Sequence, residues 1–207
     1  MDIKELKKMH LERKEQIKKR LEDFKTVQKD HNKIFEEFCF CTFTPQSKAL
    51  NCWNAVLELK RRNLLHSGTI GDIGKILQKK VRFHNNKAKY IVENRKIFFE
   101  QLKEKIISEK NNKELRENLV ENVKGYGYKE ASHFMRNIGF RDLAILDRHI
   151  LKNLASLRVI EEVPKTLTKK KYFEIEQKFL KFSDKIGIPM DELDLLFWSM
   201  EAGEIFK

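Results

Sequence analysis

Cysteine, proline and glycine are all scarce in this chain of 207 residues. Only 3 cysteines occur, Cys39, Cys41 and Cys52. An odd number of cysteines clustered in one region does not form a disulfide framework, and it indicates a reducing compartment. Without a second cluster of Cys or His, the Cys-x-Cys pair supports a metal site only weakly. We expect all three to be buried packing residues, because free cysteine behaves as a small apolar side chain.

Long apolar runs are also missing. No segment reaches the length of a signal-peptide core or of a membrane-spanning helix, and the N-terminal segment is rich in charged residues. These absences argue against a secreted or membrane-embedded protein. The sequence therefore predicts a cytoplasmic location.

The charge of the chain is strongly unbalanced. Lys and Arg number 43 against 31 Asp and Glu, which gives a formal net charge of +12. The basic residues recur along the whole chain and do not collect in a tail. This distribution favours a polyanionic partner such as nucleic acid, although a general surplus of solubilising lysines would give the same number.

Apolar residues recur at spacings of three and four, as one face of a helix requires. The pattern is clear over residues 3–27, and no alternating strand pattern competes with it. Further helices are expected over 32–42, 47–63, 70–79, 86–105, 113–122, 129–138, 148–157, 169–186 and 190–202. The fold class predicted is all-α.

The segment around Gly125 and Gly127 is the most informative part of the chain. Two glycines separated by one residue lie between two expected helices, which is the pattern of a helix-hairpin-helix. Glycines admit positive φ and leave backbone N–H groups uncovered, and the second helix points its positive end toward an anion. Lys124 and Lys129 flank the turn, and Val123 supplies an apolar anchor. We expect this hairpin to hold a DNA backbone without reading its sequence, although a plain helix connection is the simpler alternative.

Lys129 is the candidate nucleophile. It lies in the first turn after the hairpin, where the helix dipole disfavours a second positive charge, and a nucleophilic lysine must be a neutral amine. Helical spacing predicts a buried stripe and an opposite face that looks into a groove or solvent. The stripe comprises Ala131, Phe134, Met135 and Ile138, and the opposite face comprises Lys129, Ser132, His133 and Arg136. The alternative is that Lys129 is an exposed lysine that binds phosphate.

Asp147 follows an apolar run and precedes the helix expected from Arg148. Its ordinary role at this place is to cap that helix through the backbone N–H groups of the first turn. A capping carboxylate remains ionised and fixed in position. It can therefore also stabilise a developing positive charge on a sugar.

Two segments carry a family resemblance. The run Val-Lys-Gly-Tyr-Gly-Tyr-Lys-Glu-Ala-Ser-His-Phe-Met-Arg-Asn-Ile-Gly (residues 123–139) is followed by Ala-Ile-Leu-Asp-Arg-His-Ile (residues 144–150). Together they closely resemble the helix-hairpin-helix DNA glycosylases, specifically the short archaeal and bacterial 8-oxoguanine DNA glycosylase/AP lyase family. The separation of eighteen positions between Lys129 and Asp147 matches that superfamily. The similarity is also visible at residues 37–49, at 82–83 with 88–91, and at 192–195 with Trp198.

The resemblance implies a bifunctional enzyme of base excision repair. Lys129 would attack C1′ of the damaged nucleotide, expel the base and form a Schiff base with the opened sugar, which permits β-elimination of the 3′ phosphate. Asp147 would position or deprotonate this lysine and stabilise positive charge at C1′. A relative without the lysine would use water, so the lysine at position 129 predicts strand cleavage as well as excision.

The resemblance also implies a pocket for a base that has left the stack. Phe83 and Trp198 would sandwich the flipped purine, the carboxylate of Lys207 would help to recognise it, and Asp194 would support the pocket. Ordinary core packing is the alternative for the two aromatic residues.

Contacts with the DNA follow from the same resemblance. Gln46 stands where the superfamily carries a polar wedge that fills the vacated gap, although it could instead be a turn residue. Because relatives more often show Thr-Ala-Asn where this chain has Thr44-Pro45-Gln46, the preference for the opposite base stays open. The residues expected to contact DNA are Gln46, Lys124, Gly125, Gly127, His133 and Arg148.

No cofactor is expected. Many superfamily members bind a [4Fe-4S] cluster through four cysteines near the C-terminus, but this chain has no cysteine after Cys52. No catalytic metal is implied, and at most the hairpin carbonyls would hold a structural monovalent cation. The implied partner is double-stranded DNA that contains 8-oxoguanine, bound by a monomer acting at the nucleoid of a prokaryotic cytoplasm, with no membrane.

Three segments are expected in the domain organisation. Residues 1–30 form an N-terminal helix that packs on the C-terminal lobe, residues 31–139 form a helical lobe that ends in the helix-hairpin-helix (about 115–138), and residues 140–207 form the C-terminal helical lobe. The DNA would bind in a cleft between the lobes. Two alternatives to an oxidised-purine glycosylase/lyase remain: an enzyme of the same superfamily with another lesion as its target, and a noncatalytic module that only holds DNA.

Overall fold

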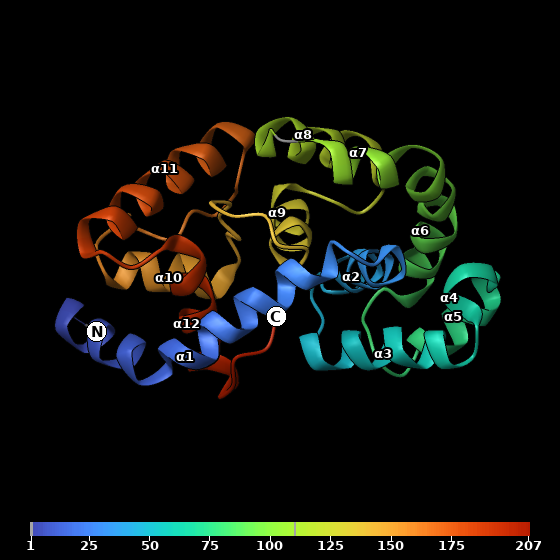
Figure 1. Ribbon diagram of the computed structural model, residues 1–207, viewed down its shortest axis with the longest axis horizontal. Helices are drawn as coiled ribbons and strands as arrows, with labels where there is room; N and C mark the ends of the chain where they lie inside the picture. The colour runs from blue at the N-terminus through green and yellow to red at the C-terminus, as the bar shows by residue number, and fades with distance from the viewer. Residues whose placement is uncertain (1, 110) are drawn as a thin grey trace. The chain divides into compact units, whose positions relative to one another are not determined.

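The computed structural model describes residues 2–109 and 111–207. It is 73% helix, and no strand occurs among those residues, which confirms the all-α prediction (Figure 1). The α-helices are α1 (Ile3–Val27), α2 (His31–Phe43), α3 (Ala49–Arg61), α4 (Leu64–Ser67), α5 (Ile70–Leu77), α6 (His84–Ile97), α7 (Lys103–Ser108), α8 (Asn112–Asn122), α9 (Tyr128–Asn137), α10 (Arg148–Ser156), α11 (Lys169–Ile186) and α12 (Met190–Ala202).

The stretch expected to be helical over residues 86–105 is helical throughout, but it is not one α-helix. Here α6 ends at Ile97, a π-helical segment η1 (Phe98–Leu102) follows, and α7 begins at Lys103. The buried residues Phe98, Leu102 and Ile106 are spaced by four, and this spacing does not distinguish an α-helix from one that contains a π-turn. Periodicity alone therefore could not locate the change.

The short helix α4 lies between the helices predicted over residues 47–63 and 70–79, and no helix is predicted there. Asn63 adopts the left-handed conformation with φ of 58° and separates α3 from α4. Asparagine tolerates this conformation better than most residues do. One such residue ends a helix without a glycine or proline to mark the break.

The described residues form two compact units. The first unit combines the segment up to Thr26 with Met135–Lys207, and the second unit is Val27–Phe134. Helix α9 runs from the second unit into the first, since its residues on the two sides of the boundary belong to one helix.

The core of the second unit is aromatic. The ring of Phe38 lies 5.1 Å from that of Phe98, 5.2 Å from Tyr126 and 5.6 Å from Phe134, measured between centroids. These rings come from α2, η1, the turn before α9 and α9 itself. Such pairs add to the energy of apolar burial. The cluster therefore fixes the start of α9 against α2.

In the first unit, α1 packs along α12. His10 Nε2 lies 2.6 Å from Glu192 Oε2, and Arg13 Nη1 donates a hydrogen bond to Ser199 Oγ over 2.5 Å. Gly139 allows a further close approach: a Cβ atom there would lie 2.9 Å from the Cα of Lys25. Helix α1 is thus an integral part of this unit.

The three cysteines are buried and free, as expected. None of the described helices is long and apolar enough to cross a membrane.

Candidate functional site

The glycine hairpin (residues 123–127) connects α8 to α9. Gly125 has φ of 87°, and a Cβ atom at this position would lie 2.7 Å from Cδ2 of Tyr90. Both the backbone conformation and the lack of space require glycine here. Asn94 ties the turn to α6, because its Nδ2 donates to the Lys124 carbonyl over 2.9 Å and its Oδ1 accepts from the Lys124 N–H over 3.0 Å.

Gly127 departs from the expectation for the hairpin. It does not have positive φ, and its N–H is not uncovered, because it donates to Oε2 of Glu130 over 3.2 Å. A glutamate at the third helical position commonly reaches back in this way to satisfy an unpaired N–H at the helix start. The sequence carried this signal, since Glu130 lies three residues after Gly127.

The structure places Lys129 in the first turn of α9, as expected. Its Nζ lies 3.0 Å from Oε1 of Glu130, and the exposed fractions of the two side chains are 25% and 14%. The two oxygens of Glu130 therefore bridge the hairpin backbone and the lysine ammonium.

The open face predicted beside Lys129 is wrong, because Ser132, His133 and Arg136 are all buried. Arg116 donates a hydrogen bond to Ser132 over 3.2 Å, and the His133 ring packs edge-on against Phe40 at 5.5 Å. Buried polar groups are stable where such partners exist. Helical spacing cannot reveal these partners. A contact of His133 with DNA stays a prediction.

Lys87 is a functional candidate that the sequence did not reveal. It is 3% exposed, and its Nζ donates to the carbonyls of Phe43 and Pro45 over 2.6 and 2.8 Å and to Ser47 Oγ over 2.9 Å. The pKa of Lys87 is lowered from 10.5 to about 8, mainly by burial; the charge of Lys129 also lowers it, while Cys52 and Glu130 raise it. In sequence, a lysine near the start of a helix looks like any surface lysine.

The contacts of Lys87 fix the loop that carries Gln46. Gln46 is exposed and has φ of 54°, a left-handed conformation uncommon for a residue with a side chain. Because Lys87 binds the carbonyl just before it and the hydroxyl just after it, the loop has little freedom to relax. This arrangement would hold Gln46 in one defined orientation.

Asp147 caps α10, as predicted. Its Oδ1 accepts from the N–H groups of His149 and Ile150, both over 2.8 Å. Two such bonds fix the carboxylate in one orientation. Arg148, which follows it, is exposed.

Asp194 lies in a buried acidic region of the first unit. It is 5% exposed, and its Oδ2 lies 3.5 Å from Nη1 of Arg136, whose guanidinium lies 4.9 Å from the Phe24 ring centre. The pKa of Asp194 is raised to about 7, mainly by burial; the charges of Asp147 and Asp191 also raise it, and Arg136 lowers it. Asp147 and Asp194 therefore influence one another electrostatically within this unit.

The residues expected to bind the base are divided between the units. Phe83, in the second unit, is 53% exposed with φ of 56°, and the Arg82 guanidinium lies 5.7 Å from its ring centre. Trp198, in the first unit, is half-buried and lies 6.4 Å from the ring of Phe206, next to the buried Lys207. An exposed aromatic ring in a strained backbone conformation is available to a ligand. The sandwich itself stays a prediction.

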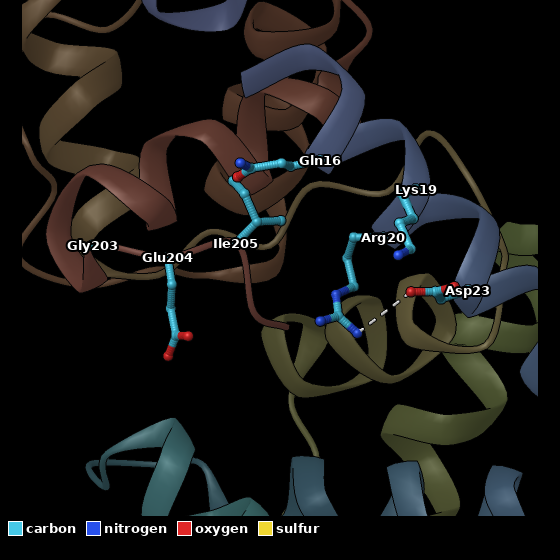
Figure 2. Close-up of a pocket in the computed structure, with 7 residues that line it drawn as sticks. All are labelled: Gln16, Lys19, Arg20, Asp23, Gly203, Glu204 and Ile205. Atoms are coloured by element: carbon cyan, nitrogen blue, oxygen red, sulfur yellow. Dashed lines mark ion pairs between the residues drawn. The ribbon is translucent and has the colours of Figure 1, made fainter. Parts of the chain in front are cut away.

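An open pocket of the first unit lies where the C-terminal segment passes α1 (Figure 2). Arg20 and Asp23 of α1 pair at 3.8 Å on one side, and Ile205 lies beside Gln16 on the other. The lining residues are Gln16, Lys19, Arg20, Asp23, Gly203, Glu204 and Ile205. Helix α1 thus flanks the segment that leads to Lys207.

No group of three or more His, Cys, Asp or Glu side chains is placed to hold a metal ion within residues 2–109 and 111–207.

An all-helical fold with a glycine hairpin and a lysine in the following helix defines a helix-hairpin-helix protein. Comparison with known families is specific: the sequence model of the family described as "8-oxoguanine DNA glycosylase" matches residues 17–188. The chain belongs to the 8-oxoguanine DNA glycosylase family.

Relatives cover nearly the whole chain. The "8-oxoguanine DNA glycosylase/AP lyase" of Fusobacterium nucleatum is 46% identical over 217 residues, which span 98% of this chain and 96% of the relative. The protein of the same name from Methanocaldococcus jannaschii is 37% identical over 99% of this chain and 97% of its own length.

Solved structures agree in fold. The crystal structure of the Methanocaldococcus jannaschii 8-oxoguanine glycosylase/lyase in complex with a 15mer DNA containing 8-oxoguanine has a TM-score of 0.91 and 36% identity, and the match covers 99% of both chains. The 8-oxoguanine DNA glycosylase of Thermotoga maritima has a TM-score of 0.89 at 33% identity, over 99% of this chain and 98% of that chain. The family resemblance seen in the sequence is thereby confirmed.

Proposed function

We propose that this chain excises 8-oxoguanine from double-stranded DNA and then cleaves the strand as an AP lyase. The observation that carries the proposal is the match, over nearly the full length, to relatives named for both activities. The net charge of +12 and the rigid glycine hairpin suit a protein that holds a DNA backbone.

Lys129 is the proposed nucleophile. Its neutral amine attacks C1′ of the damaged nucleotide, the bond from C1′ to the base breaks, and the base leaves with the electron pair of that bond and takes up a proton. Loss of a further proton and opening of the sugar ring give a Schiff base between Nζ and C1′. This Schiff base makes a C2′ proton acidic, and its removal expels the 3′ phosphate.

Asp147 is the proposed electrostatic partner of this reaction. Its carboxylate is fixed by two backbone N–H groups and would stabilise the positive charge that develops at C1′ as the base leaves. A carboxylate held in this way costs little reorganisation when the charge appears.

Recognition of the base is proposed for Phe83, Trp198, Asp194 and Lys207. Stacking on the two aromatic rings would offset the cost of removing the purine from the duplex. With a pKa raised to about 7, the carboxyl of Asp194 can serve either as a hydrogen-bond donor or as an acceptor near neutral pH.

Contacts with the DNA are proposed for the exposed residues of the hairpin and of the loop held by Lys87. Gln46 is the proposed wedge and Lys124 a backbone contact. The remaining proposed contacts are Gly125, Gly127, His133 and Arg148. No cofactor takes part, and the protein is proposed to act as a monomer in a prokaryotic cytoplasm, at the nucleoid.

The organisation into an N-terminal helix (1–30), a lobe ending in the hairpin (31–139) and a C-terminal lobe (140–207) is proposed as the functional one. The contacts of α1 with Glu192 and Ser199 support assigning the N-terminal helix to the C-terminal lobe.

Base release tests the function. A duplex with one 8-oxoguanine is incubated with the wild-type chain and with Asp147→Asn, and free 8-oxoguanine and strand cleavage are measured separately. We expect both products from the wild type and at least a hundredfold slower release from the variant, as when one charge-stabilising group is lost. Release of a different base from a lesion panel, with none from 8-oxoguanine, would contradict the proposed substrate.

A further inference from the structure

Glu130 caps the start of α9 and also contacts Lys129, the proposed nucleophile. It follows Lys129 in α9, and each of its carboxylate oxygens has its own partner: Oε2 accepts from the Gly127 N–H over 3.2 Å, and Oε1 lies 3.0 Å from Lys129 Nζ. The side chain is 14% exposed, so this carboxylate is shielded from most of the solvent. Its position is set by the hairpin itself.

Other titratable groups near this pair come from two neighbouring helices and from the turn before α9, where the charge of Glu130 acts on the buried Tyr126. Lys87 of α6 is influenced by the charges of both Lys129 and Glu130, and Cys52 of α3 is influenced by Lys129. Burial raises the pKa of the Cys52 thiol to about 12, so it contributes no negative charge near neutral pH. The ammonium group of Lys87 is held by three oxygen acceptors, so it stays fixed near Lys129 and Glu130.

The neighbourhood therefore holds two lysines and one carboxylate. Glu130 Oε1 lies 3.0 Å from the Nζ of Lys129. Among the described residues, Glu130 is the acidic side chain paired with Lys129.

We propose that Glu130 is a positioning residue: it tethers the Lys129 side chain to the hairpin and keeps it as an ammonium until the reaction begins. This inference rests on the proposed function of Lys129. Attack on C1′ requires the neutral amine, so Lys129 must first release a proton to water, and the carboxylate of Glu130 makes that release harder at low pH. Glu130 thus sets the pH above which the nucleophile becomes available.

The test uses Glu130→Gln on the full chain. Glutamine at the third helical position can still accept from the Gly127 N–H, so the helix cap is kept and only the charge is removed. Covalent trapping by borohydride is measured in single turnover, with saturating duplex that contains one abasic site, across pH 5 to 9. We expect the midpoint of the rise in trapping rate to move about one pH unit toward acid in the variant, which gives about tenfold faster trapping on the acid limb.

Glu121→Gln is the matched control. Glu121 is an exposed acid in the last turn of α8, just before the hairpin, so the same charge is removed from the same region without touching Lys129. Its pH profile should superimpose on that of the wild type. If Glu130→Gln also superimposes, or moves toward alkaline pH, the inference is overturned.

The same assay separates this inference from the proposed function. A wild-type chain that traps, a Lys129→Gln variant that does not, and an unchanged profile in Glu130→Gln would overturn the role of Glu130 alone. Absence of any adduct in the wild type across the whole pH range would overturn both. Thermal melting of each variant reports whether its fold is intact.

Discussion

At the scale of single residues, the burial of an acidic side chain carries an electrostatic cost. Asp194 is buried beside Arg136 and close to two other acidic residues, and burial raises its pKa from 3.8 to about 7. A carboxyl group in such a place is costly as an anion. Sites that accept this cost are often functional ones.

This buried carboxyl predicts a pH-dependent stability. Between about pH 4 and pH 7 the folded chain keeps the Asp194 proton while the unfolded chain has released it, so the free energy of unfolding falls as pH rises through this window and levels off above it. Asp194→Asn should remove the part of this slope that comes from Asp194, while the part from Asp191, whose pKa is raised to about 6 mainly by burial, remains. From pH 5 to pH 8, we expect the wild type to lose about 3 kcal/mol more stability than the variant in urea unfolding.

Glu162→Gln is the control for this prediction, because Glu162 is an exposed acid of the same unit. It should show the slope of the wild type. Parallel stability curves for the wild type and Asp194→Asn would contradict the burial of an acid with a raised pKa.

Individual residues were predictable from the sequence where local chemistry decides their role. The cap at Asp147 depends on a polar residue before an amphipathic run, and the sequence contains both. The burial of Ser132, His133 and Arg136 depends on partners far away in the sequence, such as Arg116 and Phe24. No helical pattern identifies such partners, and Lys87 was missed for the same reason.

At the scale of elements, the hairpin has the strictest steric requirement. Gly125→Ala combines a positive φ of 87° with a Cβ atom 2.7 Å from the Tyr90 ring, so either the ring or the turn must move. We expect a loss of about 1–3 kcal/mol in the free energy of unfolding. Weaker binding of undamaged duplex, measured by fluorescence anisotropy, should accompany it.

Gly127→Ala provides the comparison. Its backbone is not left-handed, and the nearest atom to a new Cβ is the Glu130 side chain at 3.4 Å. Its loss of stability should be well below that of Gly125→Ala. Equal losses of stability in the two variants would show that the free energy of unfolding depends here on general helix geometry and not on the conformation of the turn.

The elements themselves were largely predictable, because long amphipathic runs such as α1 and α11 have clear periodicity and clear ends. The errors occurred where one turn changes type. Neither the π-turn of η1 nor the left-handed residue Asn63 is marked by a glycine or a proline in the sequence. Tertiary packing of Phe98 and Leu102 selects the geometry there.

At the scale of the whole molecule, the chain is a basic, all-helical member of the 8-oxoguanine DNA glycosylase family. Charge and hairpin indicate a DNA-binding protein, whereas the glycosylase and lyase activities are implied by the resemblance of the segments around Lys129 and Asp147 to a known family. The central claim is therefore that Lys129 reacts covalently with damaged DNA.

Borohydride trapping on a duplex with one 8-oxoguanine tests this claim most directly. The wild-type chain, Lys129→Gln and an undamaged duplex are compared, with denaturing gel electrophoresis as the readout. We predict a covalent adduct for the wild type with the lesion, and for neither of the other two combinations. An adduct that persists in Lys129→Gln, or base release by a wild type that never forms an adduct, would contradict the account.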